Sequence, residues 1–70
     1  MERFFIEITR MSGVKTYLGW EMEEFFYPEF NLKREWGFKT QDEAERNISD
    51  AVRMMDNMGT KCTSFKVIKI

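Results

Sequence analysis

The chain has 70 residues, of which 43 % are hydrophobic and 16 % aromatic, and its formal net charge is −1. This size and composition favour one folded domain over residues 1–70 with a thin core, and they exclude an overall attraction to nucleic acid or to an anionic membrane. The chain has no histidine and one cysteine, Cys62, which excludes an internal disulfide and a Cys–His nucleophile.

Two strands are predicted at the start of the chain, over residues 3–10 and 15–21. Apolar and polar residues alternate along both segments, and β-branched and aromatic residues are frequent in them. Gly13 lies between the two and can adopt a positive φ, so a hairpin is expected. Gly19 should mark a bulge, or a place where a neighbouring ring lies over the backbone.

Residues 21–31 form an aromatic and acidic segment that contains the only proline, Pro28. Because proline disfavours an interior helix and a central strand, a loop or an irregular sheet edge is expected. In one interpretation, Phe26 and Phe30 cover an end of the core while the glutamates face solvent. In the other, the segment is an exposed protein-binding surface with aromatic anchors and acidic steering charges. The residues of that surface are Phe25, Phe26, Tyr27, Phe30, Glu21, Glu23, Glu24 and Glu29.

The second interpretation predicts the effect of substitutions in this segment. Serine at both Phe25 and Phe26 should abolish partner binding and leave the melting temperature nearly unchanged. A large loss of stability would instead assign these rings to the core.

A short third strand is predicted over residues 32–39, since Trp36 and Phe38 alternate with polar residues and glycine. Arg34 could stack on Trp36 or reach a phosphate group, and the short basic run favours stacking.

An amphipathic helix is predicted over residues 40–59. Thr40 and Glu43 have the spacing of a capping box, and Gly59 can end the helix with a positive φ. The helical spacing of its apolar residues predicts one buried stripe. The stripe consists of Ala44, Ile48, Ala51, Met55 and Met58, widened by Val52.

Residues 61–70 form the last predicted strand, in which Phe65 and Val67 lie on one face and Ile68 and Ile70 on the other. Since the alternation is not regular, either both faces are partly covered or a bulge lies near residues 67–68. The free edge of this strand could pair with a second copy of the chain or with another sheet.

These elements predict an α+β fold with a small antiparallel or mixed sheet of three to four strands and one helix packed on one face. The last strand should lie beside the first. The predicted core joins the helix stripe to Phe4, Ile6, Ile8, Leu18, Trp20, Trp36 and Phe38.

The opposite face of the sheet has no second helix to cover it, and it is a second candidate surface. It would carry Phe5 and Tyr17, and would extend to Phe65 and Val67 if the last strand turned that side outward. A nucleic-acid-binding protein could use the two rings for stacking and nearby cations for phosphate. The residues of this alternative face are Phe5, Tyr17, Arg3, Arg10, Lys15 and Lys66.

An enzyme is disfavoured by the residue types present. Glu7 or Glu35 could exchange protons, but no nucleophile, metal-ligand set or phosphate-binding loop accompanies them. No cofactor or metal is expected. Without a secretory signal or an apolar membrane segment, a cytoplasmic location is expected.

Three stretches resemble small bacteriophage accessory proteins of ββαβ type. They are residues 17–20 (YLGW), residues 36–38 (WGF) and residues 39–45 (KTQDEAE), which open the helix. The resemblance implies a non-enzymatic protein that binds and inhibits a host enzyme or a host defence complex, as anti-CRISPR proteins do. The implied partner is a host protein or protein–nucleic acid complex in the host cytoplasm; a homodimer is possible, no membrane is involved, and direct binding of nucleic acid is less favoured. The segment at 21–31 is longer and more aromatic than in such proteins.

Overall fold

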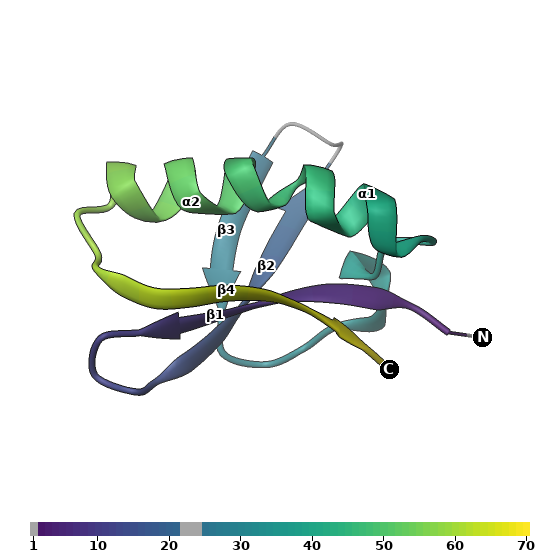
Figure 1. Cartoon of the computed structure of the whole chain (residues 1–70), viewed down its shortest axis with the longest axis horizontal. Coiled ribbons are helices and arrows are strands. Elements are labelled where there is room, and N and C mark those ends of the chain that lie inside the picture. Colours follow the sequence, from purple (N-terminus) through teal and green to yellow (C-terminus); the bar gives the residue numbers. More distant parts are fainter. Residues whose placement is uncertain (1, 22–24) are drawn as a thin grey trace.

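A four-stranded antiparallel sheet with a helical layer on one face forms the framework of the protein (Figure 1). The computed structural model describes residues 2–21 and 25–70. The sheet consists of β1 (Phe4–Arg10), β2 (Lys15–Glu21), β3 (Phe25–Glu29) and β4 (Cys62–Lys69), in the order β3-β2-β1-β4. The helical elements are η1 (Arg34–Trp36), α1 (Gln41–Arg46) and α2 (Ile48–Asn57). The predicted α+β fold is confirmed.

The hairpin and the position of the last strand follow the prediction. Gly13 has a φ of 90° in the turn between β1 and β2, and β4 lies antiparallel beside β1. The register shifts at Thr9 and Arg10, whereas Val67 and Ile68 pair regularly with Ile6 and Phe5. Val67 and Ile68 are both half-buried, so the irregular pattern of β4 reflects partial cover on both faces, and no bulge lies at residues 67–68.

The predicted helix forms two segments that follow one another almost in line (Figure 1). The Thr40 hydroxyl accepts a hydrogen bond from the Glu43 amide at 3.1 Å, and Gly59 ends the layer with a φ of 72°. Asn47 separates α1 from α2, and its side-chain amide donates to the Glu43 carbonyl at 2.8 Å. Asparagine side chains compete for backbone groups in this way, which accounts for the interruption.

The core lies between the helices and one face of the sheet. Its buried members are Ile6, Ile8, Leu18, Phe38, Ala44, Ala51 and Met55, all of which the sequence predicts. Phe26 and Met54 pack against this cluster, in addition to the predicted residues Phe4, Trp20 and Ile48. Phe65 and Val67 also pack against it, so the outward orientation considered for them is wrong.

The third strand predicted at residues 32–39 does not form. Within this segment Phe38 alone pairs with the sheet, by exchanging two backbone hydrogen bonds with Phe4 at 3.0 and 2.7 Å. The ladder between β1 and β2 covers residues 7–9 of β1, and Phe38 takes the position beside Phe4 where that ladder has ended. The Trp20 indole N–H donates a hydrogen bond to the Trp36 carbonyl at 3.0 Å, and this bond holds residues 36–38 against the sheet.

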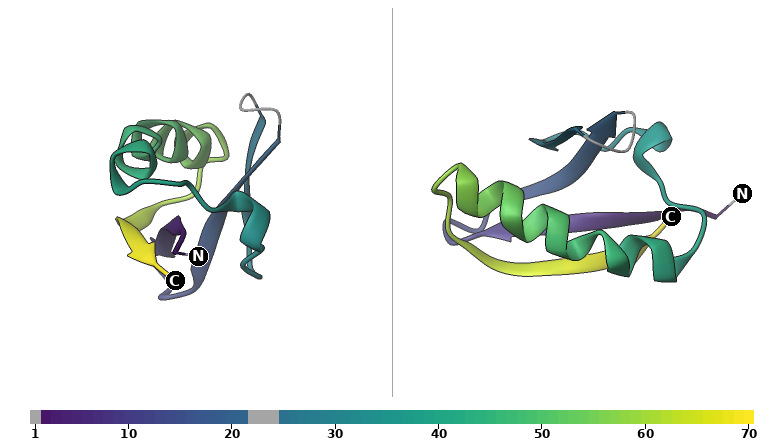
Figure 2. Two further views of the ribbon diagram at one scale, coloured as in Figure 1. Left: turned by 90° about the vertical axis from the view of Figure 1, so that its right-hand side faces the viewer. Right: turned by 90° about the horizontal axis from the view of Figure 1, so that it is seen from above.

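The face of the sheet opposite the helices is partly covered by η1. Figure 2, left, shows η1 and the helical layer on opposite sides of the β2–β3 hairpin. Trp36 is 3 % exposed and lies over Gly19, where an added Cβ atom would come within 3.1 Å of the indole and 2.5 Å of the Tyr27 ring. Gly37 lies against the tip of the Phe5 ring, and Phe5 is 4 % exposed. The expectation that this face is uncovered is therefore wrong at Phe5, and Trp36 belongs to this second layer rather than to the helix-facing core.

Candidate functional site

A cleft separates the helical layer from the β2–β3 hairpin. The hairpin stands beside the helices in Figure 2, and two cavities lie along the space between them. One cavity, of about 560 Å³, lies beside α1, and the other, of about 670 Å³, lies beside α2. Phe26 lines both cavities, so they adjoin at this residue, and we refer to them as the two halves of the cleft.

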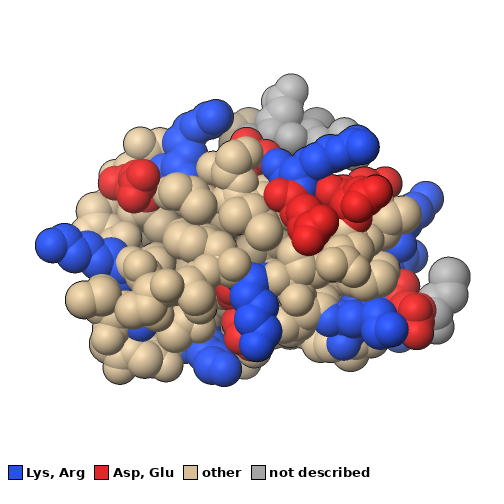
Figure 3. Space-filling view, in the orientation of Figure 1, with Lys and Arg blue, Asp and Glu red and all other residues tan. Residues whose placement is uncertain are grey.

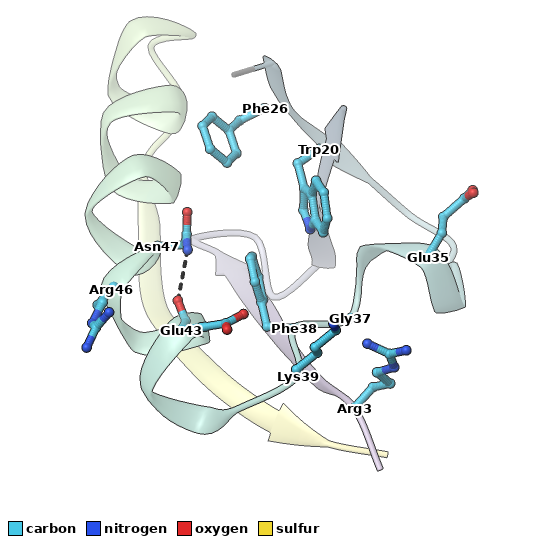
Figure 4. A pocket seen from close by; sticks show the side chains of 10 residues that line it. All are labelled: Arg3, Trp20, Phe26, Glu35, Gly37, Phe38, Lys39, Glu43, Arg46 and Asn47. Atoms are coloured by element: carbon cyan, nitrogen blue, oxygen red, sulfur yellow. Dashed lines mark hydrogen bonds between the residues drawn. The ribbon is translucent and has the colours of Figure 1, made fainter. Parts of the chain in front are cut away.

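The α1 half of the cleft has an aromatic floor and a rim of mixed charge. The Trp20 and Phe38 rings stack with centroids 5.6 Å apart. Figure 4 shows the Glu43 carboxylate on the side of these rings, whereas the Arg46 side chain points away from them. Because Arg3 and Lys39 balance Glu43 and Glu35 at the rim, this half has no strong preference for a ligand of one charge.

The α2 half is more apolar, and we call it the β3–α2 groove. β3 contributes Phe25, Phe26, Tyr27 and Pro28 to it, and α2 with its C-terminal cap contributes Asp50, Arg53, Met54, Asn57 and Met58. Phe25 is 59 % exposed and Met58 is 52 % exposed, while Phe26 and Met54 are half-buried at the inner side. Large apolar side chains exposed together from two different elements are typical of an interaction surface.

The structure divides the aromatic and acidic segment between several places. Phe25, Phe26 and Tyr27 lie at the groove, whereas Phe30 lies beyond the other end of β3, where the Arg10 guanidinium is 5.6 Å from its ring centre. Tyr27 also contacts Trp36 edge-on, at a centroid distance of 5.7 Å. The predicted anchors therefore do not form one patch, and only Phe25 combines high exposure with a place in the groove.

The acidic residues of the segment are also distributed along β3. Glu21 is exposed and pairs with Phe25 at one end of the strand, and Glu29 is half-buried at the other end. Glu23 and Glu24 lie outside the described residues.

Phe26 departs from the sequence-based expectation. It is half-buried and packs against the core, so we now expect serine at this position to lower the melting temperature, in place of the unchanged value expected for the Phe25 and Phe26 double substitution.

Sequence reasoning missed the contribution of α2 to the groove. Met58 follows the spacing of the buried stripe but lies just after α2, where it is exposed. Met54 lies next to the buried Met55, outside the stripe, and this extra apolar residue was the available signal that α2 has a second apolar side.

The alternative nucleic-acid face is only partly assembled. Tyr17 and Lys66 lie on either side of Glu7 on the face opposite the helices, and the Lys15 ammonium is 3.5 Å from the Glu7 carboxylate. Phe5 is buried and therefore unavailable for stacking. The remaining cations are elsewhere, since Arg3 lines the α1 half of the cleft and Arg10 lies beside Phe30.

Cys62 is half-buried at the start of β4, and burial raises the pKa of its thiol. Arg10 opposes this shift and Asp56 adds to it. Since the folded-state pKa is raised, the neutral thiol contributes stability below the unfolded-state pKa, and that contribution is lost as the pH rises through the folded-state pKa. We expect alkylation by iodoacetamide at pH 8 to be slower in the native chain than in the urea-unfolded chain. An equal or faster native rate, followed by mass spectrometry, would contradict this assignment.

Comparison of the chain with models of protein families, with curated proteins and with solved structures gave no match. Within residues 2–21 and 25–70, no helix has the length and apolar character needed to cross a membrane. The same residues contain no group of three or more histidine, cysteine, aspartate or glutamate side chains placed to hold a metal ion.

Proposed function

We propose that this chain is a non-enzymatic protein-binding domain whose partner docks on the β3–α2 groove. The observation that carries the proposal is the joint exposure of Phe25 and Met58 at a groove whose inner side is formed by Phe26 and Met54. An exposed aromatic ring beside half-buried apolar side chains has the composition of an interface hot spot.

The charges around the groove favour a basic partner. Among the described residues that line the groove, Asp50 and Arg53 balance one another, and Glu21 and Glu29 lie near it on the face of the sheet opposite the helices. Such acidic surroundings attract a basic partner and raise its association rate. Figure 3 shows that acidic side chains also gather over α1, which carries Asp42, Glu43 and Glu45.

The resemblance to phage accessory proteins extends this proposal to a biological role. The partner would be a host enzyme or a host defence complex in the cytoplasm, and binding would inhibit it. A basic surface that normally holds nucleic acid is a suitable target, because the acidic residues beside the groove would compete for it.

The test is affinity capture from host lysate with the intact 70-residue chain, with and without nuclease treatment. We expect one stoichiometric protein that is retained after nuclease treatment. Loss of that protein after nuclease treatment, or recovery of nucleic acid alone, would contradict the proposal.

The second candidate function is binding of nucleic acid on the face opposite the helices. Tyr17, Lys15 and Lys66 are the residues that still support it, because β1, β2 and β4 place them on one face. The buried Glu7 between them would repel phosphate. This function predicts binding that weakens steeply with salt, whereas the apolar contact in the groove predicts a weaker salt dependence.

A further inference from the structure

We infer that the partner presents an extended, basic segment that pairs with the open edge of β3 and places apolar side chains in the β3–α2 groove. This inference rests on the proposed function and names the kind of partner that the groove accepts. The backbone of β3, the position of α2 beside its open edge and the nearby charges support it.

β3 is an outer strand of the sheet and offers free backbone groups. It pairs with β2 on one side, from Glu21 opposite Phe25 to Tyr17 opposite Glu29. A proline in a paired strand is tolerated where its nitrogen faces away from the ladder, so the backbone of Pro28 is directed to the open edge. Along an antiparallel strand, successive residues direct their backbone N–H and C=O groups alternately to the two sides of the strand. Phe26, two residues before Pro28, therefore directs both its amide and its carbonyl to the open edge.

The groove adds side-chain pockets to these backbone groups. Alternate side chains of a strand added to β3 would project to the side of the sheet that faces the helices. On that side they meet Phe26, Met54 and Met58. A free strand edge beside an apolar helix surface is the arrangement in which main-chain hydrogen bonds supply affinity and pockets supply specificity.

The other outer strand, β4, is less suited to pairing. Lys66 and Lys69 lie within it and Lys61 just precedes it, and lysine on an outer strand discourages the addition of another strand. β3 contains no lysine. Pro28 removes one donor from β3, which confines a new ladder mainly to the Phe25 half, beside Met54 and Met58.

The charges select the composition of the segment. Asp50 and Arg53 are the charged residues among those described that line the groove, and their charges balance. Glu21 and Glu29 lie instead on the face of the sheet opposite the helices, to which the remaining side chains of an added strand would project. Neither glutamate takes part in the ion pairs found among the described residues, which join Lys15 to Glu7 and Lys69 to Glu2. The acidic groups are therefore available to a ligand. The fitting segment alternates apolar residues with lysine or arginine.

The experiment selects a displayed library of random nine-residue peptides on the intact 70-residue chain. We expect the enriched peptides to carry apolar residues at every second position, with lysine or arginine between them. In a synthetic copy of one enriched peptide, N-methylation should weaken binding about tenfold or more at the amides, two residues apart, that donate to the outward carbonyls of Phe26 and Pro28, and should have little effect at the amide between them. A selection without binders, or sensitivity with a helical period of three to four, would overturn the inference.

A pair of variants locates the peptide on α2. Met54→Ser should weaken peptide binding, whereas Val52→Ser, which changes the groove between α2 and β4, should not. The N-methyl scan uses the unaltered chain, so it remains decisive even if Met54→Ser fails to fold. Binding by a second copy of the chain would appear as a dimer in sedimentation and would also overturn the inference. Failure of the peptide selection together with a nuclease-resistant protein from lysate would reject the extended segment alone and leave the proposed function standing.

Discussion

Replacement of Trp36 by alanine is expected to lower the free energy of unfolding by about 3–5 kcal/mol. Trp36 is 3 % exposed, contacts Tyr27 edge-on, and covers Gly19 on the face of the sheet opposite the helices. Its carbonyl also accepts the hydrogen bond from the Trp20 indole. Small domains have stabilities near the lower end of about 5–15 kcal/mol, so this loss would leave the chain close to unfolded at 37 °C.

Urea unfolding followed by tryptophan fluorescence and circular dichroism measures this change. Lys33→Ala is the matched control: it removes an exposed side chain whose ammonium group lies 5.4 Å from the Trp36 ring centre, so the expected cost is below about 1 kcal/mol. Equal unfolding midpoints for Trp36→Ala and the unaltered chain would show that η1 does not stabilise the sheet.

Serine at both Phe25 and Met58 is expected to reduce the affinity for the captured partner by at least about thirtyfold, the effect of losing one hot-spot residue. Both side chains are more than half exposed, so the melting temperature should change little. Titration calorimetry with the purified partner measures the affinity, and thermal unfolding measures the stability.

Phe30→Ser is the control for that double variant. Phe30 is 63 % exposed, as apolar as Phe25, and lies beyond the other end of β3, outside the groove. We expect its substitution to leave the affinity nearly unchanged. An equal loss of affinity in Phe30→Ser would mean that the partner contacts the whole aromatic and acidic segment rather than the groove.

The parts of the fold that local chemistry determines could be predicted from the sequence. The helix start depends on Thr40 and Glu43, its end on Gly59, and the first turn on Gly13, and each of these acts within a few residues of the chain. The alternation in β1 and β2 likewise identified both strands and the residues that face the core.

The segment after β3 could not be predicted, because its conformation depends on distant residues. Trp36 and Phe38 alternate as they would in a strand, yet one covers Gly19 on one face of the sheet and the other packs in the helix-facing core. The chain passes from one face of the sheet to the other between Trp36 and Phe38. It can do so because the β1–β2 ladder ends before it reaches Phe4 and because the Trp20 indole donates a hydrogen bond to the Trp36 carbonyl. Neither condition can be inferred from the sequence of residues 32–39 alone.

The groove could not be predicted from the sequence either, because its two sides come from β3 and α2, which are far apart along the chain. The sequence indicated that residues 21–31 hold more aromatic side chains than a thin core needs. Which of them is exposed depends on how far β3 lies from α2, and that distance is set by the packing of Phe26 and Met54 against the core.

Residue-resolved NMR of the isotopically labelled chain with its purified partner tests the central claim most directly. The account predicts that amide signals change at residues 25–27 and along residues 50–58, which form the β3–α2 groove. Changes confined to Tyr17, Lys66 and their neighbours on the opposite face of the sheet would contradict it.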